Sequence, residues 1–584
     1  MGGDAYRKTA AAFRPFTRSG AAESGRFHII ILFPAAKSNR KGGADMKNIP
    51  NSAAREVPDN LAARKPLANA ARTPDGVTAR KIDKLTATKI SDSAATRREI
   101  IPPAVRHVLR KLTAAGYEAF CVGGCVRDTL LGRTPEDWDV TTSATPEEVM
   151  EVFPRRTIPT GIRHGTLTVR SGKGGVEVTT YRVDGEYTDR RRPDSVSFTG
   201  SLEEDLKRRD FTINAIAMGL DGELRDPCHG CDDLQAGVLR CIGVPDERFQ
   251  EDALRLMRGL RFSASLGFRL TPDAEESIRR NRLLLSEIAA ERIQMELCKL
   301  FRGAGATDIL RRYPEIIAVF WPETLEMIGF EQRNPHHCYD VWEHTLHAMD
   351  GVPADDLTLR LTMFLHDIGK PRKFCLDENG VGHFPGHQTL SADMAREMLQ
   401  RLHFPKVLRE RVALLVSLHD RPLVTTEKAV RRALNQLGEE TFRQLLAVKR
   451  ADNLAQSDMD RGRLETVMEV EKILQSLMER QACFSLKQLA VNGDDLLALG
   501  LSGRRVGKTL DALLNAVIED ELPNDREKLL DAAISINGLT PRTKTPRKRR
   551  KRRRRKPSNA KRTPTPAEGS QATTDAAQMS PEPS

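Results

Sequence analysis

Two acidic residues, separated by a single tryptophan, most constrain what this chain can fold into. Asp137 and Asp139 flank Trp138, and upstream an apolar stretch runs into Gly123 and Gly124. Side chains alternate along a strand, so a strand around Trp138 would place both carboxylates on one face. Two close carboxylates need a cation between them, and oxygen-seeking Mg²⁺ suits that position. Paired glycines let backbone N–H groups approach a phosphate. The segment predicts a phosphate loop followed by a magnesium site, although such an acidic pair alone is more often a solvated strand end.

The charge of the chain is concentrated at its ends. Residues 1–100 hold 19 Lys and Arg against 9 Asp and Glu, and residues 541–584 hold 14 against 3. The middle, residues 101–540, has 59 against 68, so it is mildly acidic although the whole chain carries +12. The basic balance is therefore no sign of a nucleic-acid-binding core. Ten consecutive basic residues at 547–556 lead us to expect a disordered tail that binds RNA loosely.

A chain of 584 residues is too long for a single hydrophobic core, so several domains are expected. Periodicity and composition divide it into six parts: 1–97, a disordered extension; 98–245, a mixed α/β head; 246–325, a helical neck; 326–475 and 476–540, two further helical regions; and 541–584, the basic tail. Met46 follows a Lys-Gly-Gly segment whose codons can spell a ribosome-binding sequence, so Met46 is a candidate start beside Met1, and residues before it would then be a mis-annotated extension.

Within the head, the apolar spacing predicts a helix over 103–115 that ends at Gly116. Strands are expected around Phe120, Trp138, Leu167 and Val178, the last two joined through a glycine-rich turn. Beyond the head the pattern is helical, with helices expected over 252–266, 273–280 and 288–301 and an apolar helix that ends at Gly369. The fold class predicted is therefore α+β.

The cysteines and the hydropathy indicate a cytoplasmic protein. Nine cysteines are scattered without the spacing of a disulfide framework, which suits a reducing compartment. No stretch approaches the ~20 apolar residues that a membrane span requires, and we expect no membrane contact.

Further polar residues point to nucleotidyl transfer. Glu177 lies on a strand of alternating character and is a candidate third carboxylate beside the acidic pair, because two-metal transfer needs such a set. Arg209 offers the forked donors that bind phosphate, and Asn214 could hydrogen-bond a ribose hydroxyl. Asp252 and Arg255 are spaced to share a helical face, where they would form an exposed ion pair or present an acceptor and donors to a base edge.

Taken in order, these segments resemble the class II tRNA nucleotidyltransferases, the CCA-adding enzymes, and their poly(A) polymerase relatives. The matching pieces are Gly123-Gly124 with Arg127-Asp128, Asp137-Trp138-Asp139, Arg208 to Ala215, Glu251-Asp252 with Arg255, and Glu291-Arg292-Ile293 with Glu296. The resemblance covers about residues 100–535.

The resemblance implies a DNA-polymerase-β-like head followed by an all-α neck and body. It implies that CTP and ATP are added to tRNA with Mg²⁺, that Asp137 and Asp139 bind the metal, and that Asp252 and Arg255 select the base without a nucleic-acid template. The nucleotide-binding set it implies is Gly123, Gly124, Arg127, Arg209, Asp210, Asn214, Asp252, Arg255 and Arg258. The residues Gly161, His164, Gly165 and Thr166 match a loop that moves between C and A addition.

A second set of residues, in the helical region after 326, has metal-ligand character. The residues are His344, His366, Asp367, His387, His419 and Asp452, and their order resembles that of the HD phosphohydrolases. The resemblance implies one or two divalent metals that activate a water, with Mn²⁺, Ni²⁺ or Fe²⁺ as candidates, and phosphomonoesterase or 2′,3′-cyclic phosphodiesterase activity. The same fold can also persist as a scaffold that only holds tRNA.

Four interpretations remain open at this point. The leading one is a tRNA nucleotidyltransferase that builds or repairs the CCA end. A poly(A) polymerase or an enzyme that adds A alone would share every segment named above. The chain could instead act chiefly as a metal-dependent phosphohydrolase, or bind RNA without catalysis, an interpretation that the intact Asp137 and Asp139 disfavour.

Overall fold

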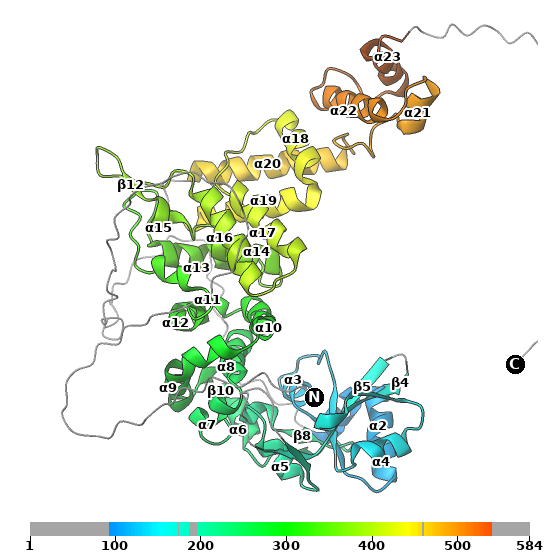
Figure 1. The fold of residues 1–584 in the computed structure, drawn as a ribbon, viewed down its shortest axis with the longest axis vertical. Helices are drawn as coiled ribbons and strands as arrows, with labels where there is room; N and C mark the ends of the chain where they lie inside the picture. Colours follow the sequence, from blue (N-terminus) through cyan, green and yellow to red (C-terminus); the bar gives the residue numbers. More distant parts are fainter. Residues whose placement is uncertain (1–92, 173, 186–194, 458–460, 540–584) are drawn as a thin grey trace, which may run out of the picture. The chain divides into compact units, whose positions relative to one another are not determined.

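The computed structural model describes residues 93–172, 174–185, 195–457 and 461–539 (Figure 1). The expectations for the N-terminal extension, the start at Met46 and the basic tail lie outside these residues. Strands and helices alternate up to about residue 245, and the rest is almost entirely helical. The predicted α+β class is confirmed.

The head contains a seven-stranded sheet with the strand order β3-β4-β5-β2-β1-β8-β9. Neighbouring strands are antiparallel except β2 and β5, which are parallel. The strands are β1 (Ala119–Val122), β2 (Asp139–Thr142), β3 (Thr157–Gly161), β4 (Thr166–Ser171), β5 (Gly174–Thr180), β8 (Ala217–Met218) and β9 (Leu224–Arg225). The parallel pair therefore lies in the middle of the sheet.

Helix α2 (Pro103–Ala114) packs against this sheet and contacts β1, β2, β4 and β5 (Figure 1). The contact is apolar: Val105, Val108, Leu109 and Leu112 of α2 belong to the same buried cluster as Val140, Leu167, Val169 and Val178 of the strands. The predicted helix is confirmed to within one residue. The predicted hairpin is also present, because β4 and β5 pair with Leu167 opposite Val178.

The strand expected around Trp138 begins one residue later, at Asp139, which corrects the prediction that Asp137 shares its pleat. The reason lies in the partner strand. Asp139 pairs with Val122, the last residue of β1, and the chain then turns away at Gly123, whose φ is +81°. On the β1 side, residues before Asp139 therefore have no strand to pair with.

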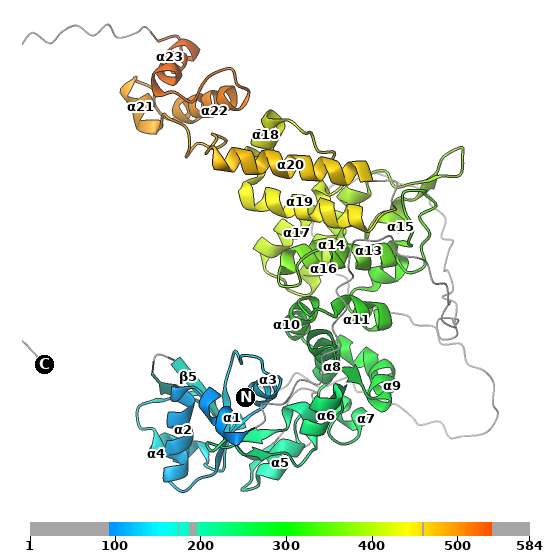
Figure 2. The same cartoon turned by 180° about the vertical axis from the view of Figure 1, so that it is seen from behind.

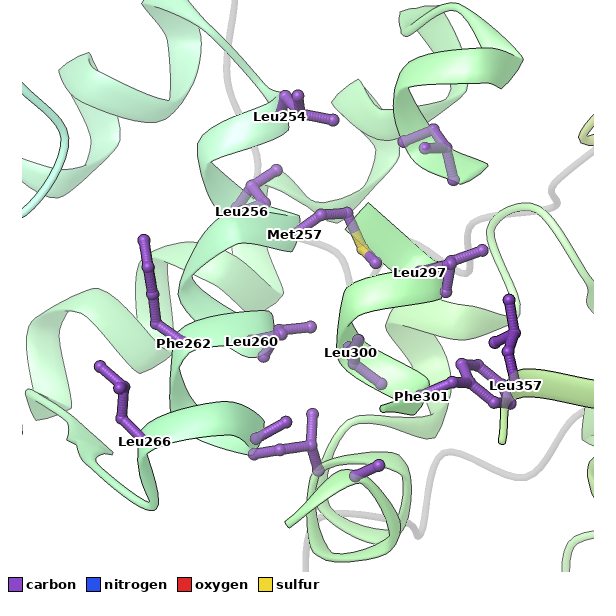
Figure 3. Packing of buried hydrophobic residues seen from close by; sticks show 14 of the residues in the cluster. Leu254, Leu256, Met257, Leu260, Phe262, Leu266, Leu297, Leu300, Phe301 and Leu357 are labelled. Carbon is purple, nitrogen blue, oxygen red and sulfur yellow. The ribbon is translucent and has the colours of Figure 1, made fainter. Parts of the chain in front are cut away.

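The helices after the head begin with α7 (Pro245–Glu251), α8 (Leu254–Leu266), α9 (Pro272–Asn281) and α10 (Ala290–Phe301). Helices α8 and α10 pack through fully buried apolar side chains, and Met257 and Leu260 of α8 point toward Leu297 and Leu300 of α10 (Figure 3). The predictions for α8, α9 and α10 all hold within two residues, with α8 beginning at Leu254 instead of Asp252.

A bundle follows whose main helices are α13 (Val341–Asp350), α14 (Leu357–Leu365), α16 (His387–Arg401), α17 (Lys406–Leu418), α19 (Glu439–Leu454) and α20 (Arg461–Glu479). Helices α19 and α20 lie side by side in both views (Figure 2). Helix α14 was expected to reach Gly369, but it ends at Leu365, and His366 to Gly369 form a turn. The bundle shares one continuous apolar cluster with α8 and α10.

Three helices close the described part of the chain: α21 (Gly493–Ala498), α22 (Arg504–Ile518) and α23 (Arg526–Ile536). They enclose a small apolar cluster of their own around Leu496, Leu513 and Leu529. None of the helices in the described ranges combines the length and the apolar character needed to cross a membrane.

The remaining helices are α1 (Ala94–Ile100), α3 (Gly124–Leu130), α4 (Pro146–Val152), α5 (Leu202–Lys207), α6 (Gly230–Ala236), α11 (Ala306–Arg312), α12 (Pro314–Ile317), α15 (Lys370–Lys373) and α18 (Glu427–Leu437). The remaining strands form three short pairs: β6 (Arg182–Asp184) with β7 (Val196–Phe198), β10 (Val238–Leu239) with β11 (Arg269–Leu270), and β12 (Cys375–Leu376) with β13 (Gly382–His383).

Candidate active site and metal centre

Three carboxylates gather where β2 begins beside β5. Asp139 is the first residue of β2, and it is the register partner of Glu177 on the parallel strand β5. Register partners on neighbouring strands lie about 5 Å apart and project from the same face. Asp137 lies two residues before β2, and its charge acts on both other carboxylates. The structure therefore brings together all three predicted acidic residues.

The pKa values of Asp139 and Glu177 reflect the repulsion among these carboxylates. Partial burial raises the pKa of Asp139; Arg209 lowers it and Asp137 raises it, and the net shift is upward. Partial burial, together with the carboxylates of Asp139 and Asp137, also raises the pKa of Glu177. Oxygen donors whose ionised forms repel one another fit the ligand set of Mg²⁺, which places a double positive charge among such donors.

The glycine pair leads from β1 into α3 and lies beside an arginine. A Cβ atom at Gly123 would sit 3.4 Å from Nη1 of Arg209, and the positive φ there also favours glycine. Arg209 is anchored by Asp205, whose Oδ2 lies 3.3 Å from Nη2. A guanidinium thus lies beside the glycine loop, and its charge also acts on the carboxylate of Asp139, so a phosphate binder and a metal-type carboxylate belong to one site.

Asn214, in the short helix η3 (Thr212–Asn214), is bonded on both sides. Its Oδ1 accepts a hydrogen bond from Nη1 of Arg127 at 2.8 Å, and its Nδ2 donates to Oδ1 of Asp210 at 3.0 Å. The other oxygen of Asp210 accepts from Nε of Arg258 at 2.6 Å. Four of the residues predicted to bind nucleotide therefore form one connected chain of hydrogen bonds.

Asp252 does not lie on the helix, which corrects the prediction that it shares a helical face with Arg255. Its backbone is extended, with φ −137° and ψ 101°, between α7 and α8. Its Oδ1 accepts a hydrogen bond from the backbone N of Leu254 at 3.1 Å, so the carboxylate bonds the first turn of α8 instead of joining it. Its Oδ2 accepts from Nη2 of Arg292 at 3.0 Å.

Arg255 has different partners. Its Nη1 forms an ion pair with Glu251 and donates to the backbone oxygen of Arg248 at 3.0 Å, while its Nη2 donates to that of Arg208 at 3.3 Å. The alternative interpretation, an exposed ion pair between Asp252 and Arg255, is therefore not what the structure shows. Arg255 reaches the same backbone segment that carries Arg209.

Several supporting residues were not predicted. Arg248 donates to the backbone oxygen of Arg209 at 2.7 Å, and Arg292 holds Asp252. Arg292 and Glu251 did stand inside the family-like segments of the sequence, which was the available signal. The sequence held no such signal for Arg248, because a linear sequence does not show which backbone carbonyl a side chain will reach.

The six metal-type residues of the helical bundle also converge. His344 lies on α13, His366 and Asp367 in the turn after α14, His387 at the start of α16, His419 at the end of α17 and Asp452 on α19. The ligand atoms of His344, His366 and Asp367 lie within 4.8 Å of one another, as do those of Asp367, His387 and His419. Asp452 joins them, with Oδ1 3.0 Å from Nε2 of His344.

Two buried or partly buried carboxylates, Asp367 and Asp452, act on the histidines of this cluster. Burial alone would lower the pKa of His366, but Asp367 and Asp452 raise it to about 10. Lys370, which was not predicted, places Nζ 2.7 Å from Oδ2 of Asp367 and 2.8 Å from Oε1 of Gln332. Buried imidazole and carboxylate donors that attract cations fit a divalent transition metal.

Comparison with known proteins places this geometry in a family. Residues 119–240 match the family model described as the poly A polymerase head domain, and 267–315 match a probable RNA and SrmB-binding site of polymerase A. Residues 387–533 match a putative tRNA nucleotidyltransferase domain 2. The CCA-adding enzyme of Lactiplantibacillus plantarum is 35% identical over 448 residues, which cover 74% of this chain and 95% of that enzyme. The chain belongs to the CCA-adding enzyme family.

Two further relatives agree with this membership. The CCA-adding enzyme of Latilactobacillus sakei is 36% identical over 430 residues, covering 73% of this chain and 96% of that enzyme. The crystal structure of the Bacillus stearothermophilus CCA-adding enzyme in complex with CTP matches with a TM-score of 0.53 and 30% identity, over 75% of this chain and 98% of that one. The resemblance expected from the sequence is confirmed.

Proposed function

We propose that this member of the CCA-adding enzyme family builds or repairs the 3′-terminal CCA of tRNA from CTP and ATP without a nucleic-acid template. The observation that carries the proposal is the register pairing of Asp139 with Glu177, with Asp137 beside them and Arg209 next to the glycine loop. In this family, bound Mg²⁺ would lower the pKa of the attacking hydroxyl and stabilise the leaving pyrophosphate.

The residues of this chain would then have separate tasks. Asp137 and Asp139 would hold Mg²⁺, with Glu177 as the third carboxylate, and the raised pKa values of Asp139 and Glu177 support a site built for a cation. Gly123, Gly124 and Arg209 would bind the triphosphate. Asn214 would face the ribose, and Asp252 and Arg255 would present an acceptor and donors to the base.

A product assay tests this proposal. The protein is incubated with Mg²⁺, tRNA that lacks its last three nucleotides, and each labelled NTP separately or CTP and ATP together. We expect two C and one A and then a stop. Unlimited addition of A from ATP alone would indicate a poly(A) polymerase, and addition of A only onto a tRNA that ends in CC would indicate an A-adding enzyme. The three relatives described above are named CCA-adding enzymes, which supports the first outcome.

A second activity is supported by the metal-type cluster. We infer a two-metal phosphohydrolase site, because the oxygens of Asp367 face different histidines. Oδ2 lies 3.4 Å from Nε2 of His344 and 3.1 Å from that of His366. Oδ1 lies 3.4 Å from Nε2 of His387 and 3.6 Å from that of His419. His344, His366 and Asp452 on one side of Asp367, and His387 and His419 on the other, would hold the ions together with Asp367, and Mn²⁺, Ni²⁺ and Fe²⁺ suit this nitrogen and oxygen set.

Metal content and hydrolysis test the second activity. The purified protein should bind about two transition-metal ions per chain after reconstitution, and hydrolyse a phosphomonoester or a 2′,3′-cyclic phosphate. His387→Ala should lower the metal content to about one ion per chain, whereas the matched surface variant His383→Ala should leave it unchanged, since His383 pairs only with the exposed Asp377. Unchanged metal content in His387→Ala would contradict the site.

A cytoplasmic location is part of the proposal. All nine cysteines are free thiols, and both substrates proposed here, tRNA and NTPs, are cytoplasmic.

A further inference from the structure

The four histidines of the metal-type cluster share one feature, a ring nitrogen that bonds a backbone oxygen. Nδ1 lies 2.7–3.2 Å from the backbone oxygen of Met363, Phe384, Val416 or Ala455, for His366, His387, His419 and His344 in turn. A backbone oxygen can only accept, so each Nδ1 carries a proton and leaves Nε2 for a metal. The Nε2 atoms meet in two pairs, His344 with His366 at 3.3 Å and His387 with His419 at 3.2 Å. The orientation of each ring therefore depends on the backbone that it bonds.

The backbone of His419 lies at a helix end and is held from outside that helix. His419 is the first residue after α17, and the carbonyl groups at a helix end have no partner within the helix. Its ring bonds Val416 in the last turn of α17, so the position of the ring follows the end of this helix. The backbone oxygen of His419 accepts a hydrogen bond from Nζ of Lys449 at 2.6 Å, and the backbone oxygen of Arg421 accepts from the same Nζ.

Lys449 comes from another helix of the bundle and is buried. It lies on α19, is 7% exposed and precedes Asp452 by three residues, which is about one helical turn. Helix α19 thus contributes a carboxylate to one histidine pair and holds the backbone of a histidine of the other pair. A cation at the end of a helix also interacts favourably with the helix dipole. This lysine is therefore the link through which α19 fixes the position of His419.

We propose that Lys449 is a positioning residue that holds His419 through its backbone oxygen and thereby sets the affinity of the ion position that His419 shares with His387. The inference rests on the proposed two-metal phosphohydrolase site. Without the ammonium group, the backbone oxygen of the buried His419 loses this donor, so the end of α17 is held less tightly. The ion position on the other side of Asp367 should be little affected, because a methionine at position 449 leaves α19 helical.

The test is a calorimetric titration of the full, metal-depleted chain with Ni²⁺, which suits imidazole ligands, whereas the carboxylates of the head suit Mg²⁺. The wild type should bind about two ions per chain. In Lys449→Met, which has no donor, one ion should bind as before and the affinity for the other should fall about tenfold, the lower end of the effect of losing a partner of a metal ligand. Lys449→Gln, whose side chain is too short to reach both carbonyl groups, should act in the same direction. It provides the test should Lys449→Met fail to fold.

A double-mutant cycle separates positioning from general stability. In a His419→Ala background, Lys449→Met should cause no further loss of Ni²⁺ affinity, because its effect passes through His419. The matched control is Arg431→Met. Arg431 of α18 is also 7% exposed, and its Nη1 donates to the backbone oxygen of Val517 at 3.0 Å, in the last turn of α22. This variant should lower the melting temperature and keep both Ni²⁺ affinities.

Distinct outcomes overturn the inference and the site beneath it. A wild-type protein that binds two ions while Lys449→Met and Lys449→Gln keep both affinities would overturn the positioning role alone. An equal loss at both ion positions, the same loss in Arg431→Met, or a further loss in the double variant would show a general structural effect and overturn it as well. A wild-type protein that binds fewer than two ions would overturn the proposed two-metal site and the inference together.

Discussion

The ionised carboxylate of Asp139 lowers the stability of the metal-free protein. Its pKa, like that of Glu177, is raised in the folded state, so ionisation favours the unfolded chain. A raised carboxyl pKa contributes stability at pH values below the unfolded pKa, and that contribution disappears as the pH rises through the folded pKa. Near neutral pH these residues are therefore charged at a net cost, which a bound cation offsets.

This cost in stability predicts that, without metal, Asp139→Asn is more stable than the wild type. We expect its melting temperature in EDTA at pH 7 to rise by about one to three degrees, because one repelling charge is gone. The advantage should vanish at a pH below about 4, where the carboxyl groups are protonated. In Mg²⁺ the order should reverse, with the wild type gaining more. Differential scanning calorimetry at several pH values checks this, with the exposed Asp232→Asn as control. A lower melting temperature for Asp139→Asn in EDTA would contradict the argument.

At the scale of elements, the sequence pattern correctly predicted the helices and strands whose boundaries depend on neighbouring residues in the chain. Helix α2 and the β4–β5 hairpin follow from apolar period and from glycine, and both were predicted to within a residue or two. The start of β2 was not, because it depends on where its partner β1 turns away at Gly123. The start of α8 was missed for a similar reason, since Asp252 bonds the helix from outside and is held by Arg292 from α10. The order of residues in the sequence identified the candidate site residues, but it did not show which residues they would hydrogen-bond.

A buried arginine joins α10 to the bundle, and its removal should be costly. Arg360 of α14 is 2% exposed and donates to the backbone oxygens of Phe301 and Gly303, both at 3.1 Å, and of Met349 at 2.7 Å. Arg360→Met would remove three hydrogen bonds from the interior of the protein, so we expect the free energy of unfolding to fall by roughly 2–4 kcal/mol. Urea unfolding followed by circular dichroism measures this. Arg280→Met, whose partners Asp246 and Glu276 are exposed or half-exposed, should change it by less than about 0.5 kcal/mol. Equal effects of the two substitutions would show that Arg360 has no special role.

At the scale of the whole molecule, two candidate chemistries occupy separate stretches of one chain. The residues proposed for nucleotidyl transfer lie between 123 and 258, in the head and on or next to α8, whereas the metal-type cluster lies between 344 and 452, on the helical bundle. The family model matched at 119–240 contains the three carboxylates and Arg209, whereas the one matched at 387–533 contains His387, His419 and Asp452. The residues proposed for one chemistry thus share no member with those proposed for the other.

This separation predicts that either activity can be removed alone. Asp137→Ala should abolish nucleotide addition, because one of the proposed Mg²⁺ ligands is lost, and leave phosphohydrolysis unchanged. His366→Ala combined with Asp367→Ala should do the reverse. Labelled-nucleotide incorporation and phosphate release, measured on the same preparations, check both statements. Loss of nucleotide addition in the His366 and Asp367 variant, with an unchanged melting temperature, would show that the sites are coupled. Full addition by Asp137→Ala would show that the catalytic assignment is wrong.

The basic end of the chain belongs to this scale too, because its effect should be electrostatic and independent of either site. Residues 541–584 hold 14 Lys and Arg against 3 Asp and Glu, and they lie outside the described residues. Each phosphate that a cation neutralises adds roughly 0.7–0.9 to the slope of log affinity against log salt. Deleting 541–584 should therefore flatten that slope for tRNA by several units and leave kcat unchanged. Filter binding between 50 and 200 mM salt would measure it, and replacing residues 547–556 by glutamine would separate charge from length. Ten consecutive like charges cannot distinguish one RNA sequence from another, so the deletion should lower the affinity for unrelated RNA equally. A loss of affinity confined to tRNA would mean that the tail recognises more than charge.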